Sequence, residues 1–133
     1  MKQRAPRHNR GFTLVEMMVV VSILLILLAV AMPIYSQSMT RAREDNLRKN
    51  LWTLNHVITQ YTLDKQKAPL SLDDLKVAGY IKEIPEDITG RNDTWVLDED
   101  DSIMSIDQSA AGISGVHSGS ERVALDGTVY SSW

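Results

Sequence analysis

The chain contains no cysteine among its 133 residues, and this absence removes several kinds of chemistry. Without a thiol there can be no disulfide framework, no zinc–thiolate site and no cysteine nucleophile. The lack of cysteine does not identify the cellular compartment of the protein, because an oxidising compartment permits disulfides without requiring them.

Recognisable catalytic and nucleotide-binding motifs are absent as well. The sequence holds no P-loop and no G-x-G-x-x-G, and its three histidines, at positions 8, 56 and 117, lack the spacing of a metal site. His117 and Ser118 are adjacent, but no G-x-S-x-G elbow accompanies them. The sequence therefore predicts a protein that is not an enzyme and that requires no cofactor.

Basic residues are scarce outside the first eleven positions. Residues 1–11 hold Lys2, Arg4, Arg7 and Arg10 and no acid, which leaves ten basic and seventeen acidic side chains in the rest, a net charge of −7. An acidic body argues against nucleic acid as the main partner, because phosphate binding needs clustered Lys and Arg.

A long apolar run follows this basic segment. From Leu14 to Ile34, only Glu16, Ser22 and Pro33 interrupt the apolar character. As a helix, a run of this length would measure about 30 Å, the thickness of the hydrocarbon core of a bilayer. A soluble core helix would carry a polar face at 3.6-residue spacing, and this run carries none. The run therefore predicts a membrane span.

Two other interpretations of the apolar run explain less. A secretory signal peptide would have a shorter apolar stretch, of about 7–15 residues, and a small-residue cleavage site. Here Met32-Pro33 follows Ala31, which is a poor site of that kind. A plain membrane anchor explains the length of the run but neither Gly11 nor Glu16.

The residues that open the run, Gly11-Phe12-Thr13-Leu14-Val15-Glu16, resemble the processing motif of type IV pilin-like proteins. The resemblance implies that residues 1–11 form a basic leader, that a membrane prepilin peptidase cuts after Gly11, and that Phe12 becomes N-methylated. It implies that Glu16 is the residue of subunit assembly. It also places the span in the bacterial inner membrane with a cytoplasmic N-terminus, whereas the Lys and Arg counts near the two ends are equal and do not decide.

A carboxylate at Glu16 has a physical use in such a motif. In hydrocarbon an unpaired carboxylate is costly. Cleavage after Gly11 would free an α-amine on Phe12, a group with an ordinary pKa of about 7.7–8.0. Inside an apolar bundle, Glu16 of one subunit can pair with the amine of the next, which fixes register as well as affinity. The alternative is that Glu16 lies at the membrane interface and reaches water.

Pro33 lies late in the predicted transmembrane assembly helix, residues 12–34. It lacks an N–H and clashes with the carbonyl four residues earlier, so it predicts a kink or a local loss of helix. The family resemblance, which matches Pro33 to a proline late in the family's span, implies that residues 26–33 can unwind in a filament. Unwinding and a simple kink both remain open.

After Pro33 the pattern changes to a single apolar stripe. Apolar residues recur at 4-3-4-3 spacing with polar residues between them: Leu47, Leu51, Leu54, Ile58 and Tyr61. We therefore expect an amphipathic helix over residues 35–66 that continues the span as one helix, from about Leu14 to Lys65. A small domain would cover the stripe, because two heptads are too few for a coiled coil. The charged segment 41–45 is either a solvated face or a source of salt bridges between subunits.

The remaining residues, 67–133, predict a globular α+β domain. Ser71 as N-cap, with an acid three residues later, predicts a helix over Leu72–Ala78, and Gly79 suits the left-handed position that ends it. Asp126-Gly127 lies between two strand-like segments and favours a hairpin. The predicted strands are Thr94–Asp98, Ile103–Ile106, Arg122–Leu125 and Thr128–Tyr130. The predicted fold class is α+β, with a long N-terminal helix packed against a small antiparallel sheet in a pilin-like lollipop.

Segments of this domain resemble one branch of the family, the major pseudopilins of type II secretion (protein G class). They are PLSLDDLKVAGYIKEIP, DTW, and HSGS followed by LDGTVYSSW. The absence of cysteine agrees, because adhesive type IV pilins usually close a C-terminal loop with a disulfide. The resemblance implies a periplasmic head in a short fibre, the pseudopilus, that helps to export folded proteins. The alternative is a type IV pilus subunit, or a minor pilin-like binding module of an adhesion or DNA-uptake system.

The resemblance further implies partners and one ligand. The partners are further copies of the chain in a helical homopolymer, the prepilin peptidase, minor pseudopilins and an inner-membrane assembly platform. The ligand is calcium, which this class binds in its C-terminal loop through hard oxygen ligands. The matching positions are Asp126, Ser118 and the carbonyl of Val116, in a loop that is shorter and less acidic than the family pattern.

Overall fold

The computed structural model describes residues 11–100 and 111–133. The chain divides into two compact units, Met1–Ser38 and Met39–Trp133, and each is described by itself. Most of the predicted leader and the predicted strand Ile103–Ile106 lie outside the described residues.

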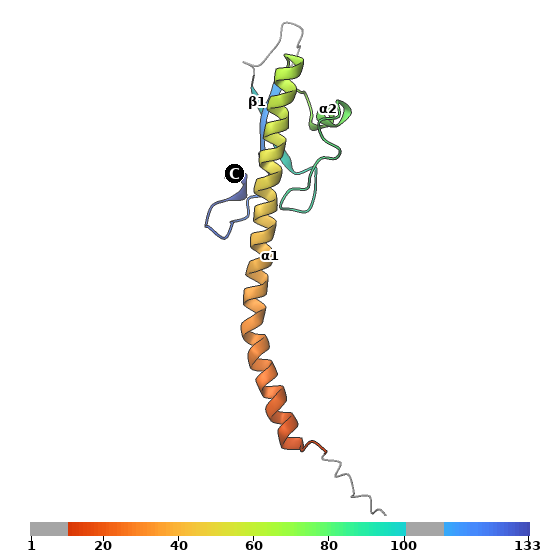
Figure 1. Ribbon diagram of the computed structural model, residues 1–133. Helices are drawn as coiled ribbons and strands as arrows, with labels where there is room; N and C mark the ends of the chain where they lie inside the picture. The colour runs from red at the N-terminus through yellow and green to blue at the C-terminus, as the bar shows by residue number, and fades with distance from the viewer. Residues whose placement is uncertain (1–10, 101–110) are drawn as a thin grey trace, which may run out of the picture. The chain divides into compact units, whose positions relative to one another are not determined.

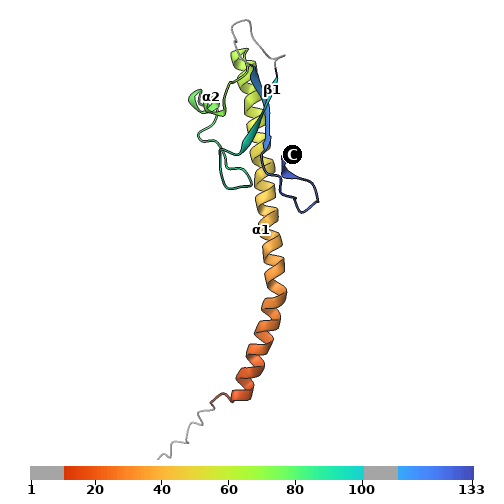
Figure 2. The same cartoon turned by 180° about the vertical axis from the view of Figure 1, so that it is seen from behind.

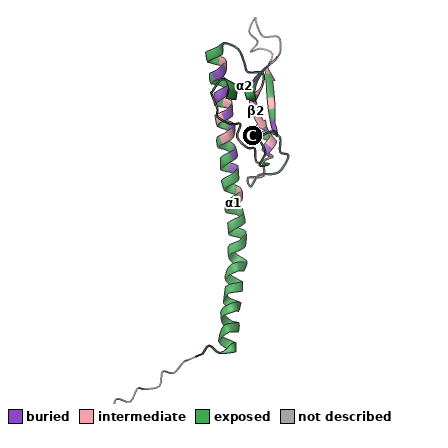
Figure 3. Ribbon diagram, turned by 90° about the vertical axis from the view of Figure 1, so that its right-hand side faces the viewer, coloured by how far each residue is buried: buried purple, intermediate pink, exposed green. Residues whose placement is uncertain are grey.

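One helix, α1, runs from Leu14 to Lys65, with the bounds that the sequence predicts (Figure 1). In the first unit its residues are exposed, green in Figure 3, in keeping with a run that is apolar on every face. Among the described helices, α1 is the one long and apolar enough to cross a membrane, judged by length and composition. It stays α-helical through Pro33, so unwinding of the preceding residues in an assembled fibre stays a prediction.

The C-terminal end of α1 is set by the residues that follow it. Gln66 adopts a φ of 55°, outside the helical region, and its side-chain amide donates to the carbonyl of Leu63 at 2.7 Å. Pro69 follows three residues later and could not extend a helix. Lys65 is therefore the last helical residue, where the helix dipole favours a cation.

In the second unit, α1 presents the predicted apolar stripe to a small domain. The buried residues of α1, all in this unit (purple in Figure 3), are Glu44, Leu47, Leu51, Leu54, Val57, Ile58 and Tyr61. All of them except Glu44 share one hydrophobic core with Trp95, Ile113 and Val116 of the sheet and with Leu75. The expectation that a head covers the stripe is confirmed.

The short helix α2, Leu72–Val77, begins and ends as its sequence predicts, except that Ala78 is the C-cap rather than a helical residue. Ser71 and Asp74 form a complete capping box. At the other end Gly79 has a φ of +81°, and the N–H of Tyr80 donates to the carbonyl of Leu75 at 2.9 Å. Both helix ends are thus closed by local hydrogen bonds.

The sheet has two antiparallel strands in the described chain, β1 (Trp95–Asp100) and β2 (Gly112–Ser118). Trp95 pairs with Ser118, and the register shifts between Asp98 and Glu99. Opposite views in Figures 1 and 2 both show the strands alongside the C-terminal half of α1. The α+β class, with a long helix against a small antiparallel sheet, is confirmed.

Two features of the sheet correct the sequence-based prediction. The predicted strands Arg122–Leu125 and Thr128–Tyr130 are not strands: a single bridge joins Val123 to Val129 around the Asp126-Gly127 turn. The chain then ends in a short 3-10 helix, η2, Tyr130–Ser132. The strand β2 was missed, because its sequence GISGVHS contains two glycines and three polar residues. Burial of its apolar residues against α1, which tertiary packing alone provides, makes it a strand.

Candidate assembly site

Gly11 and Phe12, the first two described residues before α1, are exposed. Gly11 is exposed, and a Cβ added to it would meet no atom within 4 Å. Phe12 is 75% exposed. The folded chain therefore gives no reason for a glycine followed by an aromatic residue, whereas a peptidase that reads the pair would. Cleavage after Gly11 and N-methylation of Phe12 stay predictions.

Thr13 is the N-cap of α1, a role that the sequence-based prediction did not assign. Its hydroxyl oxygen accepts a hydrogen bond from the N–H of Glu16 at 3.2 Å, and its carbonyl accepts from the N–H of Met17 at 3.2 Å. The T-x-x-E spacing of a capping box was the available signal. Glu16 consequently lies in the first turn, where the helix dipole favours an acid by about 0.3–1 kcal/mol.

The carboxylate of Glu16 has no hydrogen bond or ion pair within the described part of the chain. Ser22, the other polar side chain of the span, donates to the carbonyl of Met18 at 2.8 Å and is satisfied by its own helix. In hydrocarbon, the carboxylate would therefore need a cation from another molecule. This is the arrangement that assembly through Glu16 requires.

A second carboxylate of α1, Glu44, joins the helix to the C-terminal segment. It is 8% exposed. Its Oε1 accepts hydrogen bonds from the backbone N–H of Leu125 at 2.8 Å and from the hydroxyl of Tyr130 at 2.9 Å. Burial and the bond to Glu44 raise the pKa of Tyr130. Glu44 was counted in a charged segment at the sequence level, and its burial depends on contacts that no local pattern reveals.

Arg48, one turn after Glu44, holds the same segment from outside. Its guanidinium lies 3.1 Å from Asp126 Oδ2 and 3.8 Å from the ring centroid of Trp133. Hydrogen bonds from the hydroxyl and N–H of Thr128, aided by Arg48, lower the pKa of Asp126. The C-terminal residues are thus fastened to α1 by a buried contact and an exposed one.

Replacing Glu44 by Ala should destabilise the head, because the Leu125 N–H and the Tyr130 hydroxyl lose their hydrogen-bond acceptor. The expected loss in the free energy of unfolding is about 1–3 kcal/mol for each group left without an acceptor. Thermal unfolding of the full chain in detergent, followed by tryptophan fluorescence, measures it. Glu44→Gln is the matched control, because its carbonyl oxygen can still accept. Equal stability of the Ala variant and the natural chain would show that the hydrogen bonds to Glu44 do not stabilise the head.

The three positions matched to calcium ligands are engaged with other partners. Ser118, fully buried, donates its hydroxyl to Asp87 at 2.7 Å. The carbonyl of Val116 accepts from the amide of Asn55 at 3.2 Å. Asp126 is bound by threonine and arginine as described above. A calcium ion needs six to eight free oxygens, so these residues do not fit a calcium shell as a set. Calcium binding stays a prediction that these contacts do not support.

The histidines of the described chain have ordinary surroundings. Nδ1 of His117 lies 2.9 Å from Asp98 Oδ1 on the neighbouring strand, while Ser118 points to the opposite face of β2. His56 stacks on Trp52. No group of three or more His, Cys, Asp or Glu within reach of one metal ion occurs among the described residues.

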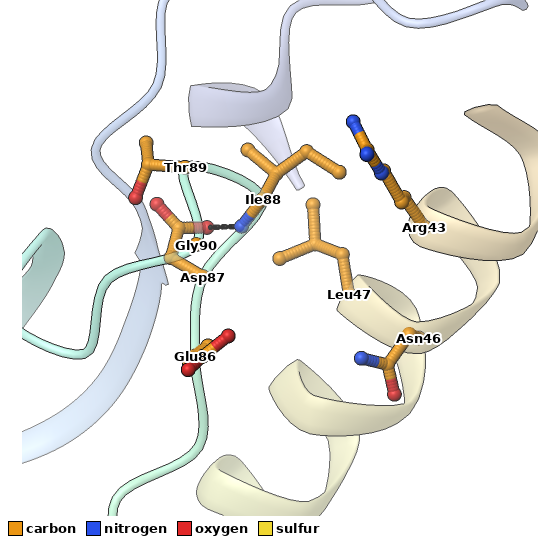
Figure 4. A pocket seen from close by; sticks show the side chains of 8 residues that line it. All are labelled: Arg43, Asn46, Leu47, Glu86, Asp87, Ile88, Thr89 and Gly90. Carbon is orange, nitrogen blue, oxygen red and sulfur yellow. Dashed lines mark hydrogen bonds between the residues drawn. The ribbon is translucent and has the colours of Figure 1, made fainter. Parts of the chain in front are cut away.

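A cavity of about 340 Å³ lies in the second unit between α1 and the loop 86–90 (Figure 4). Its lining is mixed: Leu47 of α1 and Ile88 of the loop are apolar, and Arg43 and Glu86 are among the polar residues. Neither the guanidinium of Arg43 nor the carboxylate of Glu86 forms an ion pair with a described residue.

The loop that forms one wall of this cavity is held by a buried aspartate, Asp87, which is 5% exposed. Its carboxylate accepts from the hydroxyls of Ser118 at 2.7 Å and Thr94 at 2.9 Å. The amide of Asn50 on α1 donates to the carbonyl of Glu86 at 3.0 Å. The wall is therefore fixed before anything enters the cavity. Sequence reasoning missed Asp87, which has no motif around it.

Comparison with known proteins gives two matches. A family model described as the prokaryotic N-terminal methylation motif matches residues 6–32. Competence protein ComGC of Halalkalibacterium halodurans is 35% identical over 96 residues, which span 69% of this chain and 94% of that protein. No solved structure matches the chain.

These matches agree with the geometry of the site. The methylation motif covers Gly11, Phe12 and Glu16, and one apolar helix begins directly after it. The relative is similar over nearly its whole length, so the likeness extends beyond the motif into the head. The chain therefore belongs to the type IV pilin-like family and is a single-pass, membrane-anchored member of it.

Proposed function

We propose that the chain is the structural subunit of a fibre that serves DNA uptake. After cleavage behind Gly11 and methylation of Phe12, subunits polymerise through α1, with Glu16 of one paired to the amine of the next. The observation that carries the proposal is the 35% identity across 94% of a competence protein, competence being the uptake of DNA. The unpartnered Glu16 carboxylate supports the mode of assembly.

The type II secretion pseudopilus is the second candidate. It rests on the resemblance of the tail segments to major pseudopilins, whereas the similarity to the competence protein favours the DNA-uptake alternative. Both candidates share the prepilin peptidase, an assembly platform and minor pilin-like subunits as partners. In both candidates the leader lies in the cytoplasm and the head lies on the outer side of the membrane. For a pseudopilus, that outer side is the periplasm.

The negative charge of the chain beyond residue 11 indicates that DNA is the cargo of the fibre rather than a ligand of this subunit. Beyond residue 11 the net charge is −7, and binding to phosphates needs clustered cations. We therefore place DNA binding on other components of the uptake system. The subunit contributes a polymer that extends and withdraws, and no chemical step.

Deletion of the gene in the source bacterium separates the two candidates. The proposal expects uptake of added DNA to be lost and the amounts of secreted proteins to stay normal. Restoring the natural gene should recover uptake, and a Glu16→Val copy should not. Loss of secretion with normal DNA uptake would contradict the proposal and support the pseudopilus.

A further inference from the structure

An exposed tryptophan marks the side of α1 that the head leaves uncovered. Trp52 is 67% exposed, and its ring is stacked on His56 with centroids 4.9 Å apart and planes 7° from parallel. The stack holds the indole in one orientation. An exposed, pre-oriented tryptophan is costly in water and is the residue type most enriched at interface hot spots.

The cavity between α1 and the loop 86–90 is suited to a single large side chain. Its volume of about 340 Å³ is at the small end for ligand pockets. Ile88 provides apolar contact, whereas Leu47 is 1% exposed and contributes little surface. The guanidinium of Arg43, another lining residue, forms no ion pair with a described residue and can lie over an aromatic ring. The same chain already uses that contact, between Arg48 and Trp133 at 3.8 Å.

The tryptophan and the cavity lie on opposite sides of the same helix. Trp52 follows Arg43 by nine positions, or about two and a half turns at 3.6 residues per turn. A projecting group on one side and a receiving pocket on the other make a contact that joins copies head to tail. Such a contact cannot close into a two-fold dimer and generates a filament.

The charges beside the two surfaces are complementary. Lys49, one turn before Trp52, forms no ion pair with any described residue, and neither does Glu86 at the cavity. Entry of Trp52 into the cavity of a neighbour would bring this lysine and this glutamate to the rim of one interface. The pair would add specificity rather than much affinity.

We propose that Trp52 of one subunit inserts into the Arg43–Ile88 cavity of the next subunit in the fibre. The inference rests on the proposed function, because it assigns a contact between the globular domains of neighbouring subunits within the polymer that α1 forms. Trp52 supplies the buried aromatic anchor, Arg43 lies over its ring, and Lys49 pairs with Glu86 at the rim. The rigid loop around Asp87 keeps the pocket open for the incoming ring.

Cross-linking within fibres of the full chain tests the proposal, and the absence of cysteine gives a clean background. Lys49→Cys combined with Glu86→Cys, which keeps Trp52 and Arg43, should give a ladder of oligomers on denaturing gels after treatment with a short bismaleimide. Lys49→Cys combined with Val77→Cys is the matched control, because Val77 is 88% exposed on α2 and should give no ladder. Absence of a ladder from the first pair, or dimers from Lys49→Cys alone, would overturn the proposal.

Fibre yield gives a second measurement. Trp52→Ala should lower the amount of fibre by about thirtyfold or more, in the range of a hot-spot tryptophan, whereas Val77→Ala should leave it unchanged. Lys49→Glu and Glu86→Lys should each weaken fibres, and the double exchange should recover them. Intact fibres from the Trp52→Ala chain, with reduced DNA uptake, would assign the tryptophan to another ligand and overturn the proposal. Absence of fibres from the natural chain would refute the proposed function itself.

Discussion

Replacing Glu16 by Val is expected to abolish fibres while processing and membrane insertion remain normal. The carboxylate has no partner among the described residues, and the amine that cleavage creates on Phe12 is the cation the mechanism supplies. Removing one member of a buried ion pair costs about 3–5 kcal/mol, which is more than about a hundredfold for each subunit contact. Electron microscopy of sheared fibres and immunoblotting of membranes measure the two effects.

Controls separate assembly from the local role of Glu16 at the start of α1. Glu16→Gln keeps the size and polarity of the side chain but not its charge, so it should also prevent fibres. Thr13→Ala removes the N-cap acceptor, costs about 1 kcal/mol of helix stability, and should leave fibres in place. Normal fibres from either Glu16 variant would show that the carboxylate does not pair subunits.

A bulky residue in place of Gly11 is expected to leave an uncut precursor in the membrane. Gly11 is exposed and a Cβ there meets nothing within 4 Å, so Gly11→Trp should not disturb the described fold. Any effect then reports on the peptidase. The uncut chain lacks the amine on Phe12, so it should also fail to form fibres.

The size of the residue at position 11 provides the control for this prediction. Gly11→Ala should allow partial cleavage and a mixture of two bands, whereas Gly11→Trp should give the slower band alone. Gel mobility and intact mass distinguish the forms, because the leader is eleven residues long. A Trp variant with the mobility of the mature chain would mean that processing does not depend on this position.

The parts of the fold that were predictable from sequence are those encoded by neighbouring residues. The apolar run and the stripe that ends at Tyr61 predicted α1, and Ser71 with Asp74 predicted the start of α2. In each case the signal and the structure it specifies lie within a few turns of one helix. The same kind of signal, T-x-x-E, would have revealed the capping role of Thr13.

The parts that sequence reasoning missed depend on contacts between distant residues. Glu44 accepts from Tyr130, and Asp87 accepts from Ser118, across long stretches of chain. The strand β2 forms because Ile113 and Val116 are buried at 1% and 3% exposure, although its glycines and serines disfavour a strand. The Asp126-Gly127 turn formed as predicted, but Glu44 and Arg48 draw its flanking residues onto α1 rather than into a sheet.

The intact mass of the chain isolated from fibres of the source bacterium is the most direct measurement of the assembly mechanism. We expect a polypeptide that begins at Phe12, with one methyl group on its α-amine and all eleven leader residues gone. Fibres built from chains that still carry residues 1–11 would contradict the mechanism, because Glu16 would then have no terminal cation with which to pair.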